Sequence, residues 1–223
     1  MFVCWRLKCL FFLSKKAFQF STKLKYFLSK LIKSISLLSS PNQNRQHKMW
    51  PLPQPKTPAE QYYRDIIMPI IDIRNRSDES SEIIPGFMWL GDASNAMDAE
   101  THGFNGIANC AARDTLTNRD YYDPSWKYTE YTASDDPEYN ILDEHLDDFM
   151  NFMDECRGEN RRVLVHCVAG INRSATLCIA YLVIRERMTL EEAVRHCFAA
   201  RPCILTNSSF VMQLIERFVD FHQ

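Results

Sequence analysis

The sequence predicts an α/β fold in which a central, mostly parallel sheet is flanked by helices. Short apolar runs, of the kind that form buried strands, alternate with longer segments in which apolar residues recur at helical spacing. This alternation is typical of strands that are joined through helices and run parallel in one sheet. Composition also changes near residue 58, so we expect a basic extension with a linker over residues 1–58 and a folded domain over residues 59–223.

The extension differs from the domain in charge and in proline content. Residues 1–59 contain 11 of the 26 Lys and Arg residues and none of the 28 Asp and Glu residues. Apolar and lysine side chains in residues 17–38 fall mostly on opposite sides of a predicted helix. Five of the ten prolines lie between residues 41 and 58, which predicts an extended linker.

Three interpretations of the extension remain open. An amphipathic helix within residues 15–38 would bind an anionic membrane surface. A mitochondrial presequence fits the lack of acidic residues, although such segments favour arginine and Arg6 is the only arginine before residue 45. The third interpretation is a disordered extension, or a start site placed too far upstream. The apolar run at residues 10–13 is too short to span a membrane.

Cysteine usage and charge limit the classes of function. The eight cysteines form no CxxC pair and no metal-ligand spacing with the six histidines, so we expect no metal and no cofactor. The pattern indicates a reducing compartment, and we expect a cytoplasmic protein, with mitochondrial or membrane-surface association as the alternative. Beyond residue 59, 15 Lys and Arg residues stand against 28 Asp and Glu residues, which argues against nucleic-acid binding.

The first half of the domain is expected to alternate short strands with helices. Thr57 predicts the N-terminal cap of a helix that runs to about Met68. Apolar runs and turn residues then predict these elements: strands at 83–84 and 87–90, a helix at 93–102, and strands at 106–110 and 127–132. Residues 121–126 and 133–139 are expected to be loops.

The second half is expected to be mainly helical around one strand. A strongly amphipathic helix is predicted over residues 141–157, ended by Gly158. The next predicted elements are a strand at 163–165, a helix at 175–187, and a helix from 189 to about 200 that Pro202 breaks. The last helix begins at Asn207 or at Ser208.

Residues 166–174 connect that strand to the following helix and predict a phosphate-binding loop. A loop that closes into a helix N-terminus points several backbone N–H groups at one place, and the helix dipole adds positive potential there. Gly170 permits backbone angles that other residues resist, and Arg173 offers a planar pair of donors that matches two phosphate oxygens. The loop consists of Val168, Ala169, Gly170, Ile171, Asn172 and Arg173.

Cys167 opens this loop and is the candidate nucleophile. The positive potential of the loop is expected to lower the pKa of its thiol, so that a thiolate forms near neutral pH. Ser174 can donate a hydrogen bond to the sulfur and help it leave later in a reaction. A buried, inert cysteine is the alternative. The preceding His166 and the arginine six positions later make that alternative less favoured.

With these motifs in place, residues 83–221, approximately, resemble the catalytic domain of dual-specificity phosphatases in the cysteine-based protein tyrosine phosphatase superfamily. The resemblance is carried by Ile84-Pro85-Gly86, Leu90-Gly91-Asp92, Asn109-Cys110-Ala111, Asp135 ahead of Asn140-Ile141, the segment from His166 to Ser174, Asn207, and Gln213-Leu214. It implies a protein tyrosine phosphatase-like fold. A domain of this length is similar to the compact dual-specificity group.

The resemblance implies a protein phosphatase that acts on phosphotyrosine and on phosphoserine and phosphothreonine in phosphoprotein substrates. It implies that Cys167 attacks phosphorus to form a cysteinyl-phosphate, while Arg173 and the loop N–H groups hold the phosphate oxygens. Asp135 would protonate the leaving group and later help to activate water. His166 would orient the loop, and Asn207 would brace it.

Two residue assignments remain open. Asp135 and Asp136 are adjacent, and counting back from Asn140-Ile141 favours Asp135 as the acid. In some relatives a cysteine at the position of Cys110 forms a reversible disulfide with the nucleophile, which protects the thiolate from further oxidation. The alternative for Cys110 is a small buried residue on a core strand.

Three other functions remain as alternatives. A phosphoinositide or RNA 5′-triphosphate phosphatase is disfavoured because the loop has no second cationic group and the domain is acidic. A pseudophosphatase that only binds phosphoproteins predicts damage to the Cys, the Arg or the Asp, and none is damaged. A membrane-recruited scaffold would make the basic extension the working part of the chain.

Overall fold

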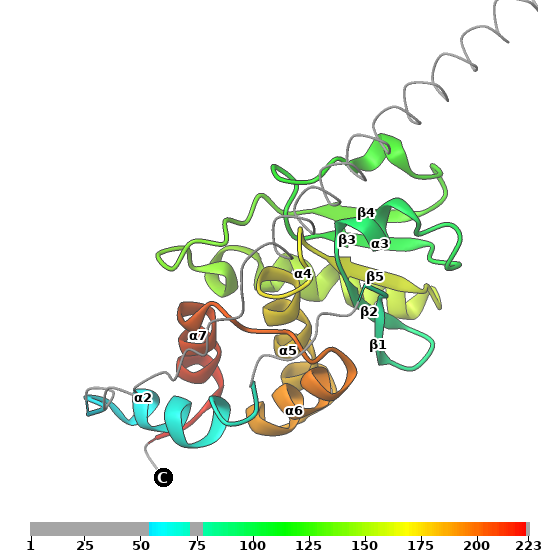
Figure 1. Ribbon diagram of the computed structural model, residues 1–223. Coiled ribbons are helices and arrows are strands. Elements are labelled where there is room, and N and C mark those ends of the chain that lie inside the picture. Colours follow the sequence, from blue (N-terminus) through cyan, green and yellow to red (C-terminus); the bar gives the residue numbers. More distant parts are fainter. Residues whose placement is uncertain (1–53, 72–77, 222–223) are drawn as a thin grey trace, which may run out of the picture. The chain divides into compact units, whose positions relative to one another are not determined.

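The structure, a computed structural model, describes residues 54–71 and 78–221 and contains one five-stranded sheet (Figure 1). The strand order is β1-β2-β5-β3-β4. The strands are β1 (Ser81–Ile84), β2 (Met88–Gly91), β3 (Gly106–Asn109), β4 (Lys127–Glu130) and β5 (Val163–His166). Only the β1–β2 pair is antiparallel, and the other three pairs are parallel. The predicted mostly parallel sheet is therefore confirmed.

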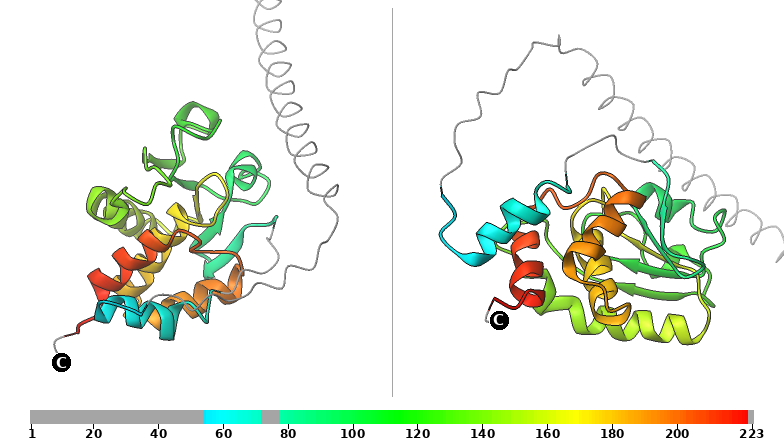
Figure 2. Two further views of the ribbon diagram at one scale, coloured as in Figure 1. Left: turned by 60° about the vertical axis from the view of Figure 1, so that its left-hand side comes forward. Right: turned by 90° about the horizontal axis from the view of Figure 1, so that it is seen from below.

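Helices cover both faces of the sheet (Figures 1 and 2). They are α2 (Pro58–Tyr62), the π-helix η1 (Tyr63–Ile67), α3 (Ala93–Met97), the 3₁₀ helix η2 (Arg119–Tyr121), α4 (Ile141–Gly158), α5 (Arg173–Arg185), α6 (Leu190–Ala200) and α7 (Ser208–Phe218). Side chains alternate between the faces of β2. Met88 and Leu90 join the main core under α4 to α7, whereas Trp89 joins a smaller core under α3.

Capping residues explain where several helices begin. Thr57 accepts a hydrogen bond from the Glu60 N–H at the start of α2, as its sequence position predicts. Thr189 and Glu192 form the predicted capping box at the start of α6. The last helix begins at Ser208, because the Asn207 side chain accepts a hydrogen bond from a backbone N–H and caps the helix.

The structure corrects the bounds of several predicted elements. The helix expected at 93–102 ends at Met97, because the chain then turns so that Ala99 and Phe104 both pack in the smaller core. The helix expected to run from Thr57 to about Met68 changes from α to π after Tyr62, where the Met68 N–H bonds the Tyr63 carbonyl. Residues 119–121 form η2 at the edge of an expected loop, and β4 ends at 130 rather than at 132.

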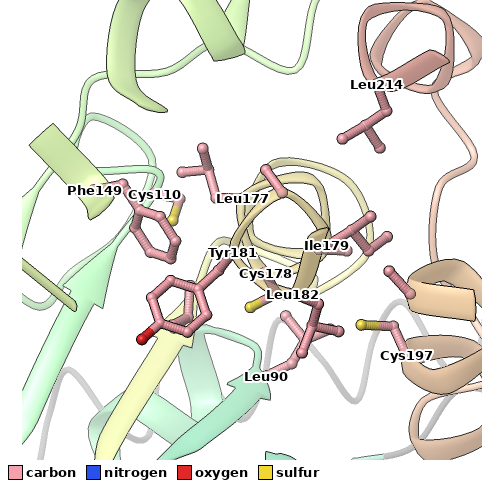
Figure 3. Close-up of a cluster of buried hydrophobic side chains, with 14 of the residues drawn as sticks. Leu90, Cys110, Phe149, Leu177, Cys178, Ile179, Tyr181, Leu182, Cys197 and Leu214 are labelled. Atoms are coloured by element: carbon pink, nitrogen blue, oxygen red, sulfur yellow. The ribbon is translucent and has the colours of Figure 1, made fainter. Parts of the chain in front are cut away.

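Helix α5 passes through the centre of the domain and fixes the position of its own N-terminus. Ten of its 13 residues are buried. In Figure 3, side chains of α5 project all around the helix axis, toward Phe149 on one side and toward Leu214 on another. A helix that is apolar on all sides belongs in a core. Its first residue, Arg173, comes two positions earlier than the sequence predicts.

Candidate active site

The segment between β5 and α5 forms a tight loop that only glycine permits at its middle. Gly170 has a φ of +66°, in the left-handed region. A Cβ atom at this position would lie 2.5 Å from the carbonyl oxygen of Gly91. The close approach of this loop to the end of β2 explains why Gly170 is required, beyond its backbone angles.

A buried arginine holds the loop from behind. Arg201, which follows α6, donates a hydrogen bond from Nε to the Gly170 carbonyl at 2.8 Å and another from Nη2 to the Ala169 carbonyl at 3.4 Å. Its side chain is 1% exposed. Carbonyl groups that are bonded to Arg201 point away from the inside of the loop, so the N–H groups can point inward. Arg201 could not be identified from the sequence, because no local pattern marks a contact across 31 residues.

The Cys167 thiol lies at the base of the loop and receives hydrogen bonds there. Gly170 donates its backbone N–H to the Sγ atom at 3.2 Å, and Ser174 donates its hydroxyl at 3.3 Å. Burial by itself raises the pKa of this thiol. The hydrogen bonds from Ser174 and the Ile171 N–H, together with the charge of Arg173, outweigh burial and lower the pKa below the ordinary value of 9.0.

Replacement of Ser174 by alanine is expected to raise the pKa of Cys167. A hydrogen bond to a charged group contributes about 1.5–3 kcal/mol, so its loss is expected to raise the pKa of Cys167 by about one to two units. The pH dependence of Cys167 alkylation by iodoacetamide measures the shift. Ser208→Ala, an exposed serine at the start of α7, is the matched control. An unchanged alkylation profile in Ser174→Ala would show that the hydroxyl does not stabilise the thiolate.

The Arg173 guanidinium is buried and is held from one end. Its Nη1 donates to the Ala133 carbonyl at 3.0 Å and to Asp114 Oδ2, which completes an ion pair. Its Nε–H has no hydrogen-bond partner within the described residues. A buried donor without a partner is unfavourable, and a phosphate oxygen would satisfy it. Asp114 is a second residue that sequence analysis missed.

The structure brings Asp135, and not Asp136, against the loop. The Asp135 carboxylate accepts hydrogen bonds from the side-chain amides of Asn172, at 3.1 Å, and Asn207, at 3.2 Å. The Asp136 carboxylate instead accepts the backbone N–H of Glu138 within its own turn. Asp135 is exposed, so an incoming substrate can reach its carboxyl group.

The Asn172 side chain links three segments around the site. Its amide nitrogen binds Asp135, and its Oδ1 atom accepts hydrogen bonds from the Thr206 hydroxyl and the Asn207 N–H, both at 3.1 Å. The phosphate-binding loop is thereby connected to the Asp135 loop and to the segment between α6 and α7. The sequence predicts Asn172 as a loop residue, but its linking role could not be predicted.

His166 is buried as a neutral side chain directly before the loop. The ring is fully buried, and its Nδ1 atom lies 3.3 Å from the Cys167 carbonyl oxygen. Burial lowers the pKa of His166 to about 4, against the opposing effects of that hydrogen bond and the charge of Asp92. The neutral ring donates its Nδ1 proton to the carbonyl, which holds the backbone of Cys167.

Cys110 directly follows β3, and its backbone is bonded to His166, the residue before Cys167. Its backbone N–H donates to the His166 carbonyl at 2.7 Å, and both it and Cys167 are free thiols. Burial raises the pKa of Cys110 well above its ordinary value, and the negative charge of Cys167 adds to this effect. The resulting neutral thiol is a poor nucleophile.

The family profile described as "Dual specificity phosphatase, catalytic domain" matches residues 88–219. The chain is 36% identical over 141 residues to a probable rhodanese domain-containing dual specificity protein phosphatase of Dictyostelium discoideum, and 34% identical over 139 residues to dual specificity protein phosphatase 22 of Mus musculus. These matches cover 60% and 61% of this chain.

A solved structure has the same fold. The human tyrosine phosphatase-like serine/threonine/tyrosine-interacting protein matches with a TM-score of 0.56 and 30% identity, over 63% of this chain and 96% of that chain. Among the relatives compared by sequence, this chain spans 28% of the length of the Dictyostelium protein and 72% of the length of the mouse protein. It spans 34% of human dual specificity protein phosphatase 4, which is 33% identical over 138 residues. The part of these proteins that is similar to this chain is the catalytic domain.

Proposed function

The chain belongs to the dual specificity phosphatase family, and on that premise we propose that it hydrolyses phosphotyrosine and phosphoserine or phosphothreonine monoesters in proteins through a cysteinyl-phosphate intermediate. The observation that carries the proposal is the Cys167 thiol, which accepts hydrogen bonds from the Gly170 N–H and the Ser174 hydroxyl in a loop whose last residue is Arg173. These contacts favour the thiolate. A thiolate is the reactive form of cysteine, and the loop supplies the donors that a phosphate dianion needs.

The first step transfers the phosphoryl group to sulfur. The Sγ atom of Cys167 forms a bond to phosphorus, and the bond from phosphorus to the ester oxygen breaks. The Nε–H of Arg173 and the loop N–H groups bind the equatorial oxygens as their charge changes. Asp135 donates its proton to the departing oxygen, which leaves as a tyrosine, serine or threonine hydroxyl.

The second step releases phosphate. The Asp135 carboxylate accepts a proton from water as the water oxygen bonds to phosphorus, and the bond from phosphorus to sulfur breaks. Ser174 donates a hydrogen bond to the departing Cys167 thiolate. The same contact that lowers the pKa of the thiol therefore makes the sulfur a better leaving group.

Substrate class is tested with phosphopeptides and polyphosphorylated compounds. Phosphotyrosyl and phosphothreonyl peptides are the expected substrates, because Arg173 is the only cation among residues 167–173. Phosphoinositides and RNA 5′-triphosphates carry several phosphate charges and would meet an acidic domain. Faster turnover of either polyphosphorylated class than of both phosphopeptides would contradict the proposal.

Two roles are proposed for Cys110. Its position next to β5 supports a reversible disulfide with an oxidised Cys167, whereas its burial and raised pKa support an inert core residue. Peptide mapping by mass spectrometry after mild hydrogen peroxide treatment distinguishes them. A linked Cys110–Cys167 peptide supports the redox role. Overoxidised Cys167 without a linked peptide supports the core role.

We further propose that the basic extension directs the protein to its location and that residues 59–223 act as the catalytic domain, with the cytoplasm as the compartment. The extension through residue 53 lies outside the described residues. Within residues 54–71 and 78–221, no helix is long and apolar enough to cross a bilayer. Removal of residues 1–53 keeps Thr57, which caps α2. Retained phosphatase activity with lost membrane or mitochondrial association would support this division of roles over a scaffold.

A further inference from the structure

A groove lies between η1 and the segment that joins α6 to α7. Its volume is about 680 Å³. Figure 2 shows the segment of α2 and η1, in cyan, next to α7. The groove is lined mainly by Tyr63, Arg64, Met68, Ile71, Leu205 and Thr206. The volume is sufficient for a few side chains of a bound polypeptide.

One wall of the groove is bonded directly to the phosphate-binding loop. The Leu205 N–H donates to the Ile171 carbonyl at 2.9 Å. The Thr206 hydroxyl donates to Asn172 Oδ1 at 3.1 Å. Ile171 and Asn172 belong to the loop that would hold the phosphate. Leu205 and Thr206 therefore place this wall of the groove directly beside the loop.

The groove combines an apolar surface with one cation. Met68 is 44% exposed, which is unusual for a large apolar side chain in this domain, and it lines the groove together with the buried residues Ile71 and Leu205. Arg64 is half-buried, and no ion pair of its guanidinium occurs within the residues that the structure describes. A guanidinium binds carboxylates well, and exposed apolar surface next to a site favours a partner's apolar side chain.

Half of the groove is built outside the domain shared with relatives. Tyr63 to Ile71 precede residues 88–219, which match the family. These residues are nevertheless held on the domain, because η1 packs against α6 and α7. The groove is thus a feature of this chain that the common phosphate site does not explain.

We propose that this groove binds the substrate polypeptide next to its phosphorylated residue, and that it selects an apolar side chain at Met68 together with an acidic side chain at Arg64. The inference rests on the proposed phosphatase function and adds a sequence preference to it. The occupant is an extended segment of a phosphoprotein, because one wall of the groove is bonded to the phosphate-binding loop and the groove carries a cation in an otherwise acidic domain.

The test uses the full chain and pairs of phosphotyrosyl peptides. One peptide set carries Leu and Glu within about four residues on either side of the phosphotyrosine, and the other carries Ser and Lys there. The wild type is expected to show a kcat/KM about tenfold higher on the Leu-Glu set, mainly through KM, which corresponds to about 1.4 kcal/mol. Arg64→Glu is expected to remove this preference, and Met68→Ser to reduce it.

Two controls separate the groove from the chemistry. Arg217→Glu reverses an exposed charge on α7, and it is expected to keep the wild-type preference. An aryl phosphate, which has no flanking residues, reports the chemical site alone. Turnover of the aryl phosphate without any difference between the peptide sets overturns the groove proposal and leaves the phosphatase function intact. Failure of the wild type on all substrates overturns both.

Another outcome identifies a different occupant. If Arg64→Glu and Met68→Ser both raise turnover of the aryl phosphate several-fold, the groove is covered by a segment of the chain itself, and the proposal is overturned. Thermal unfolding of each variant checks that the fold is kept. Because Met68→Ser changes an exposed side chain, it tests the groove even where Arg64→Glu unfolds the protein.

Discussion

Replacement of Cys167 by serine is expected to abolish turnover of an aryl phosphate, with kcat lowered by about 10,000-fold or more. A serine hydroxyl is not ionised near neutral pH, and the contacts that lower the pKa of the Cys167 thiol do not bring a hydroxyl into that range. Because the loss concerns the attacking atom itself, it is the largest effect expected for any single substitution in the chain.

The same variant is expected to keep its affinity for phosphorylated ligands. Arg201 holds the loop through the carbonyls of Gly170 and Ala169, and none of these bonds involves the sulfur atom, so the loop keeps its shape. Binding of a phosphopeptide to Cys167→Ser, measured by calorimetry, checks this. Cys203→Ser, at another buried cysteine, is the matched control and is expected to retain activity. Substantial turnover by Cys167→Ser would place the nucleophile elsewhere.

Replacement of Asp135 by asparagine is expected to lower kcat by about 100- to 1,000-fold on phosphoserine and phosphothreonine peptides. An amide has nearly the same shape as the carboxyl group but cannot donate the proton that an alkoxide leaving group requires. An aryl phosphate with an acidic phenol needs less protonation, so its turnover should fall much less. This dependence on the leaving group separates loss of the acid from a general distortion of the site.

Asp136→Asn is the matched control, because the two residues are adjacent and both are exposed. The Asp136 side chain bonds only within its own turn, whereas Asp135 is bonded by Asn172 and Asn207 across the site. We therefore expect Asp136→Asn to retain most of the wild-type activity on every substrate. A larger loss in Asp136→Asn than in Asp135→Asn would reverse the assignment of the acid.

The parts of the site that are local in sequence could be predicted from the sequence. Cys167, Gly170 and Arg173 lie in one loop between a strand and a helix, and the geometry of such a loop follows from general properties of the backbone. Most strands and helices could be predicted for the same reason, because their caps and apolar spacing are local signals.

The parts that depend on contacts between distant residues could not be predicted. Arg201 and Asp114 reach the loop from positions that are 31 and 59 residues away, and no local pattern marks either contact. The change from α2 to η1 and the groove beside it arise from packing on α6 and α7. The early end of α3 has the same origin, because the smaller core and not helical propensity decides where that helix ends.

The most direct test of the mechanism is detection of the phosphorylated intermediate. The full chain is mixed with a fast aryl phosphate substrate, quenched with acid within the first turnover, and digested for peptide mapping by mass spectrometry. We expect one phosphoryl group on the peptide that contains Cys167, and no such peptide from Cys167→Ser. Phosphate on another residue, or active turnover without any phosphorylated enzyme, would contradict nucleophilic catalysis by Cys167.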